Sequence, residues 1–129
     1  MFERDADHAL IFGNHGGLGQ VLDLDIAGGA SWAAYDWQAA ITAVAQVDGG
    51  TWLVALADGG LQRFTWTPTG SIGLGAAPVI HDLAYDPATG AVFGGSDGLV
   101  LAIDPGTGNI LASHPVDGPV RKVLPLLNR

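Results

Sequence analysis

A glycine-rich stretch near the start of the chain, GNHGGLG (residues 13–19), is the first candidate for chemistry. Glycine-rich loops bind phosphate through backbone N–H groups, most often where a helix begins directly after the loop. This stretch lacks the lysine of the P-loop and the G-x-G-x-x-G spacing of dinucleotide-binding proteins. The residues that follow, GQVLDLDI, alternate like a strand, so we predict no nucleotide site and no cofactor.

Acidic residues and histidines are the candidate metal ligands. Asp23 and Asp25 alternate with apolar residues and share one face of a predicted strand, but no EF-hand loop surrounds them. The stretch ERDADH (3–8) also gathers acidic residues, a pattern at a chain terminus that is usually spurious as a metal site. The histidines lack close ligand spacing such as H-x-x-x-H; they are His8, His15, His81 and His114. We therefore predict no metal ion.

The adjacent pair His81-Asp82 has the residue types of a general base and an acid that orients it. Such a pair needs a nucleophile to activate, and the sequence identifies none; the chain has no cysteine. We predict no catalytic residue and no enzymatic activity.

Composition excludes several classes of partner. The net charge is −8 with only 5 Lys and Arg residues, too few to grip nucleic acid or an anionic membrane surface. No apolar run is long enough to span a bilayer, and the start MFERDADH lacks a signal-peptide pattern. These features favour a cytoplasmic or virion-associated protein. Because the chain has no cysteine, it forms no disulfides.

Short strands joined by tight turns are the predicted local structure. TWLVAL (51–56) and LVLAI (99–103) are apolar runs bounded by Asp, Gly or Pro, and the chain contains 20 glycines and 7 prolines. The alanine-rich stretch 31–47 has helix propensity, but the internal repeat argues against a helix there. We predict an all-β protein.

The repeat relates residues 41–72 to residues 80–110. Val44 aligns with Leu83, Leu53 with Val92, and Asp58-Gly59 with Asp97-Gly98, each pair 39 positions apart. Residues 8–29 form a partial copy and RKVLPLL (121–127) matches only the first strand of a unit. Asp97-Gly98 is interpreted as a tight turn between the two middle strands of a repeat.

The segments DLAYDPATG (82–90) and AVFGGSDGLVLAID (91–104) resemble the repeats of WD-repeat and quinoprotein-like β-propellers. The resemblance implies blades of four antiparallel strands, and such blades contain about 40–45 residues. No Trp-Asp dipeptide ends a third strand and the usual Gly-His pair is missing. Apolar packing would therefore have to make the blades rigid.

On this interpretation residues 1–129 form a single domain of three repeats of about 40 residues. It contains a partial blade (8–37, with strands at 8–14, 19–26 and 31–37), blades at 41–74 and 80–116, and an isolated first strand at 121–127. Propellers close with about four to eight blades, and an open fan would expose apolar surface. We therefore expect another chain to complete the ring, either in a homodimer with six blades and an exchanged strand at each junction or within a larger protein assembly.

Two groups of residues are the candidate interaction sites. The entrance to each first strand would form one rim of the channel, a place for partner binding; its residues are Thr42, His81, Asp82, Arg121 and Lys122. Aromatic residues of SWAAYDWQ would pack between blades or at an oligomer interface; they are Trp32, Tyr35 and Trp37. Trp32 and Trp37 are five positions apart, so in a regular strand their side chains point to opposite faces. They share one pocket only if a bulge intervenes.

The function that these features favour is that of a non-enzymatic structural, scaffold or protein-interaction module, for example a virion component. The alternative is a carbohydrate-binding propeller lectin that stacks sugars on aromatic rings. A third interpretation, a fragment of a quinoprotein-like enzyme, would need more basic residues than the 5 present.

Overall fold

The computed structural model describes residues 2–3, 8–29, 31–66 and 69–123 of the 129-residue chain. Strands are the only regular elements within these ranges, and no helix forms there. The strands are β1 (Phe2–Glu3), β2 (His8–His15), β3 (Leu18–Asp25), β4 (Ser31–Asp36), β5 (Ile41–Asp48), β6 (Thr51–Leu56), β7 (Gly60–Thr65), β8 (Gly70–Ala76), β9 (Ile80–Asp86), β10 (Ala91–Ile103) and β11 (Ile110–Pro119).

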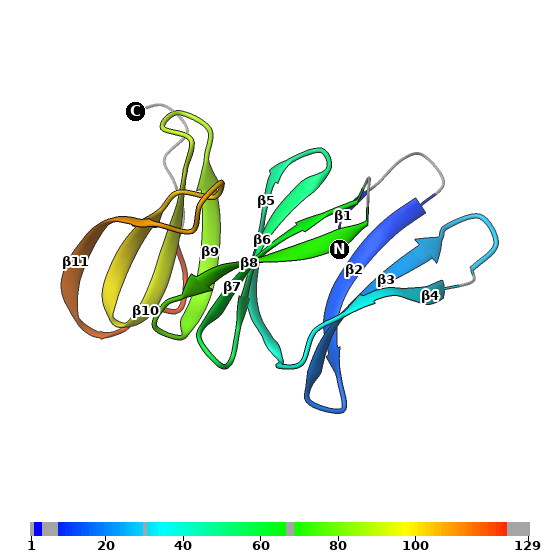
Figure 1. Ribbon diagram of the computed structural model, residues 1–129, viewed down its shortest axis with the longest axis horizontal. Coiled ribbons are helices and arrows are strands. Elements are labelled where there is room, and N and C mark those ends of the chain that lie inside the picture. The colour runs from blue at the N-terminus through cyan, green and yellow to red at the C-terminus, as the bar shows by residue number, and fades with distance from the viewer. Residues whose placement is uncertain (1, 4–7, 30, 67–68, 124–129) are drawn as a thin grey trace.

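These strands form three antiparallel sheets that lie side by side in chain order (Figure 1). The first sheet has the order β1-β2-β3-β4, the middle sheet β5-β6-β7-β8 and the last sheet β11-β10-β9. The all-β prediction is confirmed, including strands rather than a helix over the alanine-rich stretch 31–47. The row of sheets is open, because no described segment joins the first sheet to the last.

Strand β10 turns back on itself and contributes two passes to the last sheet. Its first half pairs with β9 and its second half with β11. A Cβ atom placed on Gly94 would lie 3.5 Å from the side chain of Ile103, although nine extended residues would span roughly 30 Å. The backbone reverses at Gly98, which has φ 75°. The predicted turn at Asp97-Gly98 therefore lies inside β10.

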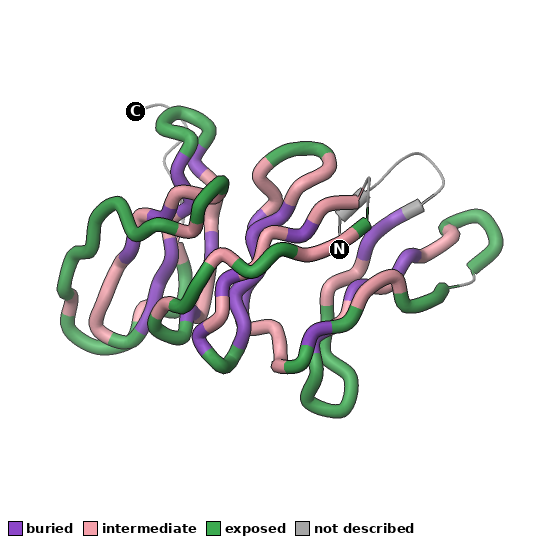
Figure 2. The backbone as a smooth tube through the Cα atoms, in the orientation of Figure 1, coloured by how far each residue is buried: buried purple, intermediate pink, exposed green. Residues whose placement is uncertain are grey.

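The chain packs its sheets face to face around two apolar clusters. One cluster lies between the first and middle sheets and contains Leu10, Val21, Trp37, Trp52, Val54, Leu56 and Phe64. The other lies between the middle and last sheets and contains Ala43, Ala45, Leu53, Ala55, Leu61, Ile80, Leu83, Val92, Leu101 and Ile103. Burial is concentrated in the strands nearest these clusters, whereas β11 and the loops are exposed (Figure 2).

Polar contacts add specific links between neighbouring sheets. The Asn14 side chain both accepts from the Ile41 N–H (2.7 Å) and donates to the Ile41 carbonyl (3.0 Å), which fastens β2 to the start of β5. The Arg63 guanidinium donates to the carbonyl of Gly106 at 3.0 Å and so joins β7 to the last sheet. Such bonds limit the relative orientations of sheets that apolar packing alone would leave free to slide.

Strand register shows how the middle and last sheets correspond. Val44 lies opposite Val54 in the middle sheet, and Leu83 lies opposite Gly94 in the last sheet. Since Val44 and Leu83 hold equivalent places in β5 and β9, Val54 corresponds to Gly94.

The alignment of Leu53 with Val92 is therefore wrong by one residue. The loop between β9 and β10 (87–90) is two residues longer than the loop between β5 and β6 (49–50). A bulge between Gln46 and Asp48 offsets one of these residues, so the net difference is one residue. A shift of one residue turns a strand side chain to the opposite face of its sheet. Leu53 and Val92 thus point from different sheets into the same cluster, rather than in equivalent directions.

The ends of the chain also differ from the expected blades. The first sheet has its own two-residue first strand, β1, which pairs with β2 only at Ala9 and Leu10. Residues 121–123 of the expected closing strand belong to no strand, and 124–127 lie outside the described residues. The sheets also run slightly beyond the expected ends at 74 and 116, to Ala76 and Pro119.

We expect Gly59→Ala to destabilise the fold by about 1–3 kcal/mol, because Gly59 has φ 88° and a Cβ there would lie 2.6 Å from the Ala77 carbonyl oxygen. The matched control is Gly49→Ala, which meets nothing within 4 Å and has no positive φ. It should change stability by less than about 0.5 kcal/mol. Urea unfolding followed by tryptophan fluorescence measures both, and equal midpoints would contradict the described turn.

Candidate functional site

Two predicted rim residues, His81 and Asp82, are neighbours in β9 but have different partners. The His81 ring Nε2 is 2.9 Å from Oδ1 of Asp97, so the partner of this histidine is not its sequence neighbour Asp82. Asp82 instead accepts a hydrogen bond from the Val123 N–H at 2.7 Å, and Lys122 Nζ lies 4.0 Å from the same carboxylate. Asp82 therefore fastens the segment after β11 to β9.

The other two rim residues do not join this group. Thr42 donates its hydroxyl hydrogen to the Ala55 carbonyl at 3.2 Å, a contact within the middle sheet. Arg121 is exposed and directly precedes Lys122, the residue whose Nζ lies near the Asp82 carboxylate. The strands that carry Thr42 and His81, β5 and β9, do lie side by side. The structure thus brings together Asp82 and Lys122, gives His81 a separate partner in Asp97, and leaves Thr42 to a role in sheet pairing.

Two of the three predicted interface aromatics are packed inside the chain. Tyr35 and Trp37 belong to the cluster between the first and middle sheets, where Trp37 also donates its indole N–H to the Ser71 hydroxyl at 2.9 Å. A register shift between Val21 and Leu22 interrupts the β3–β4 pairing. A bulge of this kind is what the spacing of Trp32 and Trp37 requires if they are to share one face. Trp32, by contrast, is 48% exposed near the start of β4.

The aromatic cluster around Tyr35 and Trp37 is larger than the sequence suggested. The ring centroids of Phe64 and Trp37 are 5.7 Å apart, and Phe12 lies 5.8 Å from Phe64 in an edge-to-face arrangement. Trp52 is fully buried beside them. Phe12 and Phe64 belong to no recognisable sequence motif. Only the alternation of apolar and polar residues in their strands could have indicated that they lie in this cluster.

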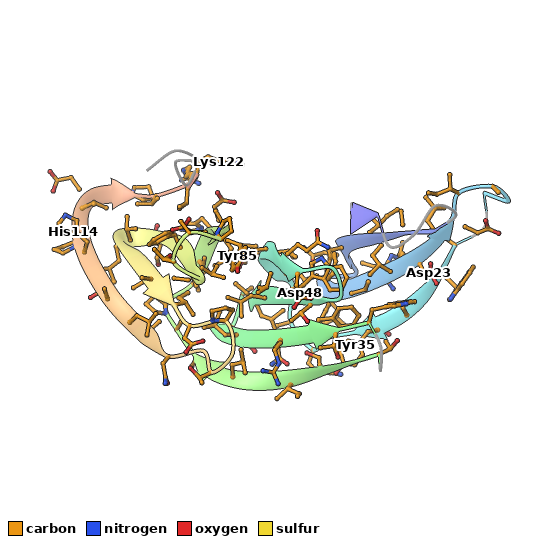
Figure 3. All side chains as sticks on the ribbon, turned by 90° about the horizontal axis from the view of Figure 1, so that it is seen from above. Asp23, Tyr35, Asp48, Tyr85, His114 and Lys122 are labelled. Carbon is orange, nitrogen blue, oxygen red and sulfur yellow. The ribbon has the colours of Figure 1, made fainter. Side chains whose placement is uncertain are left out.

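Each end of the row leaves one apolar sheet face without a covering sheet among the described residues. In the last sheet this face carries Phe93, Val100 and Ala102, with Ala112 and His114 of β11, and it surrounds a shallow hollow of about 250 Å³. Figure 3 shows His114 on the outer side of β11, away from the middle sheet.

In the first sheet the corresponding residues are Ile11, Leu22 and Leu24. They alternate along their strands with Leu10, Val21 and Asp23, which are buried on the side of the middle sheet. All three are half-buried. Neither open face was identified residue by residue from the sequence, because the strand registers had to be known first.

The glycine-rich stretch 13–19 is a hairpin. It contains the turn between β2 and β3, where Gly16 and Gly17 have φ 60° and 80°. In the part of the chain that the structure describes, no three His, Asp or Glu side chains gather as a metal-ligand set. Nor does any helix there have the length and hydropathy needed to cross a membrane.

Comparison of the sequence with protein-family models gives no match, and comparison with curated proteins finds no relative. The function is therefore argued from the fold and its surfaces.

Removing the Asp82 carboxylate should release the segment after β11. We expect Asp82→Ala to increase the rate of tryptic cleavage after Arg121 and Lys122 several-fold under native conditions, because the Val123 N–H loses its acceptor. Mass spectrometry of the products identifies these two cleavage sites.

The control is Asp97→Ala, which removes the neighbouring contact with His81 but no contact of the 121–123 segment. It should leave the rate of cleavage unchanged. If the original chain were already cut as fast as Asp82→Ala, the fastening role of Asp82 would be refuted.

Proposed function

We propose that this chain is a non-enzymatic structural or protein-interaction module of β-propeller type, whose row of blades is completed by further protein. The observation that carries the proposal is the open apolar face at each end of the row. Three sheets are fewer than the roughly four to eight that close a propeller, so such a row needs additional blades.

The arrangement of the first strands supports this architecture. In a propeller the first strand of each blade lies nearest the axis, so successive first strands are neighbours. Strands β5 and β9 are neighbours here, although 39 residues separate Ile41 from Ile80. In both sheets the remaining strands follow in chain order from this first strand, which lies at the sheet edge.

The polar side chains near β9 support an assembling rather than a catalytic role. His81 contacts an aspartate at the β10 turn, and Asp82 contacts the backbone of the following segment. Both therefore contribute to holding chain segments together. The carbohydrate-binding alternative has less support, because Trp37 and Trp52 are buried in the cluster between sheets and cannot stack on a sugar.

Self-association is the direct test of this proposal. Size-exclusion chromatography with light scattering should give a mass of at least twice the 13.2 kDa of one chain, increasing with concentration if the contact is weak. A folded chain that stays at 13.2 kDa up to millimolar concentration, without dye binding to exposed apolar surface, would refute it. Glycan-array binding with quenching of Trp32 fluorescence would instead favour the lectin.

A further inference from the structure

The two contacts between sheets inside the chain have the same polarity. The face of a sheet that looks toward the next sheet in sequence is called here its forward face, and the opposite face its backward face. In β6 of the middle sheet, Leu53 lies on the forward face and packs in the cluster with the last sheet. Its neighbour Val54 lies on the backward face and packs in the cluster with the first sheet.

Register extends this polarity to the outer sheets. Leu10 and Val21 are on the forward face of the first sheet, and Leu83 and Leu101 are on the backward face of the last. A forward face meets a backward face at both contacts. The faces left over are therefore one backward face, on the first sheet, and one forward face, on the last.

These leftover faces carry apolar residues at their centres, as do the faces that are paired inside the chain. The backward face of the first sheet carries Ile11, Leu22 and Leu24, and the forward face of the last carries Phe93 and Val100, and Ala102 beside them. The forward face also has the hollow of about 250 Å³, which can receive side chains from an opposing sheet.

Carboxylates near the two faces already have partners within the chain. Asp86, fully buried, accepts hydrogen bonds from the Thr89 hydroxyl (2.8 Å) and the Ala88 N–H (3.2 Å). At the edge of the first sheet, Asp36 accepts from the Gln20 amide at 3.4 Å. These hydrogen bonds within the chain offset part of the cost of covering the two carboxylates with a second copy.

We infer that the forward face of the last sheet of one copy binds the backward face of the first sheet of a second copy, head to tail. This inference rests on the proposed function and specifies its partner as the chain itself. Two copies then provide six sheets and two identical junctions, within the range of about four to eight blades that closes a propeller. The contact repeats the polarity of the two contacts within each chain.

Cross-linking between two single-cysteine variants tests the polarity, since the chain has no cysteine of its own. Ala102→Cys labels the forward face and Leu22→Cys the backward face; both residues are half-buried and lie on faces without a covering sheet. With a short bismaleimide, the mixture should give a covalent 1:1 dimer, and each variant alone should give at least ten-fold less. Gly49→Cys, in the exposed β5–β6 turn, is the control and should not link to Ala102→Cys.

The outcomes separate the inference from the proposed function. If light scattering shows an oligomer but Ala102→Cys links only to itself, or no variant links, the head-to-tail contact is refuted and self-association stands. If the chain is a monomer that binds no apolar dye and no variant links, both are refuted. A monomer that does bind the dye refutes only the head-to-tail contact. Capture of a different protein by the forward face, in competition with a second copy, would also overturn the inference.

A pair of charged variants gives an independent measurement. Val100→Asp and Leu22→Asp should each lose self-association, because each buries a carboxylate in one half of the junction. Their equimolar mixture should regain a 1:1 dimer through the one junction that remains intact, whereas a contact between two identical faces would not be rescued in this way. Circular dichroism verifies that each variant is folded.

Discussion

The middle sheet must be covered on both of its faces, and the rest of the structure depends on this constraint. Strand β6 buries successive residues, from Trp52 to Leu56, so neither of its faces can be exposed to water without cost. Burial of a valine or leucine side chain, such as Val54 or Leu53, contributes roughly 1.5–3 kcal/mol to stability. The first and last sheets supply the two covers, and their positions are set by this requirement.

The same constraint leaves each outer sheet covered by another sheet on one face only, among the described residues. Each of them packs one face against the middle sheet and carries apolar residues on the other, including Leu22 in β3 and Phe93 in β10. Antiparallel sheets tolerate one solvated face when that face is polar. These faces are not polar at their centres, and this is the reason for proposing an assembly.

Polar residues mostly fasten the chain to itself. Asp86 caps its own loop, Asn14 ties β2 to β5, and Asp82 holds the segment that leaves the last sheet. Backbone groups at loops and strand ends need such partners when a neighbouring strand does not provide them. The residue types that first suggested chemistry are therefore used, in the described structure, to satisfy hydrogen bonds at the ends of strands.

The sequence by itself determined the all-β class and many of the strands and turns. Alternating or continuous apolar runs ended by Asp, Gly and Pro are local signals, and they correctly placed β2, β3, β4, β6 and the second half of β10. The turn at Asp97-Gly98 was also placed correctly, since Gly98 has φ 75°. The burial of Trp37 and Tyr35 between sheets was likewise among the alternatives that the aromatic spacing indicated.

Only the tertiary structure decided which face of each strand meets which neighbour. That choice depends on register, and a net difference of one residue between the β5–β6 and β9–β10 hairpins reverses it without any visible change in the hydrophobic pattern. For the same reason the sequence could not reveal that Asp97 partners His81, or that Ile11 and Val100 belong to open faces. These relations join residues far apart in the chain, and they exist only once the sheets have packed.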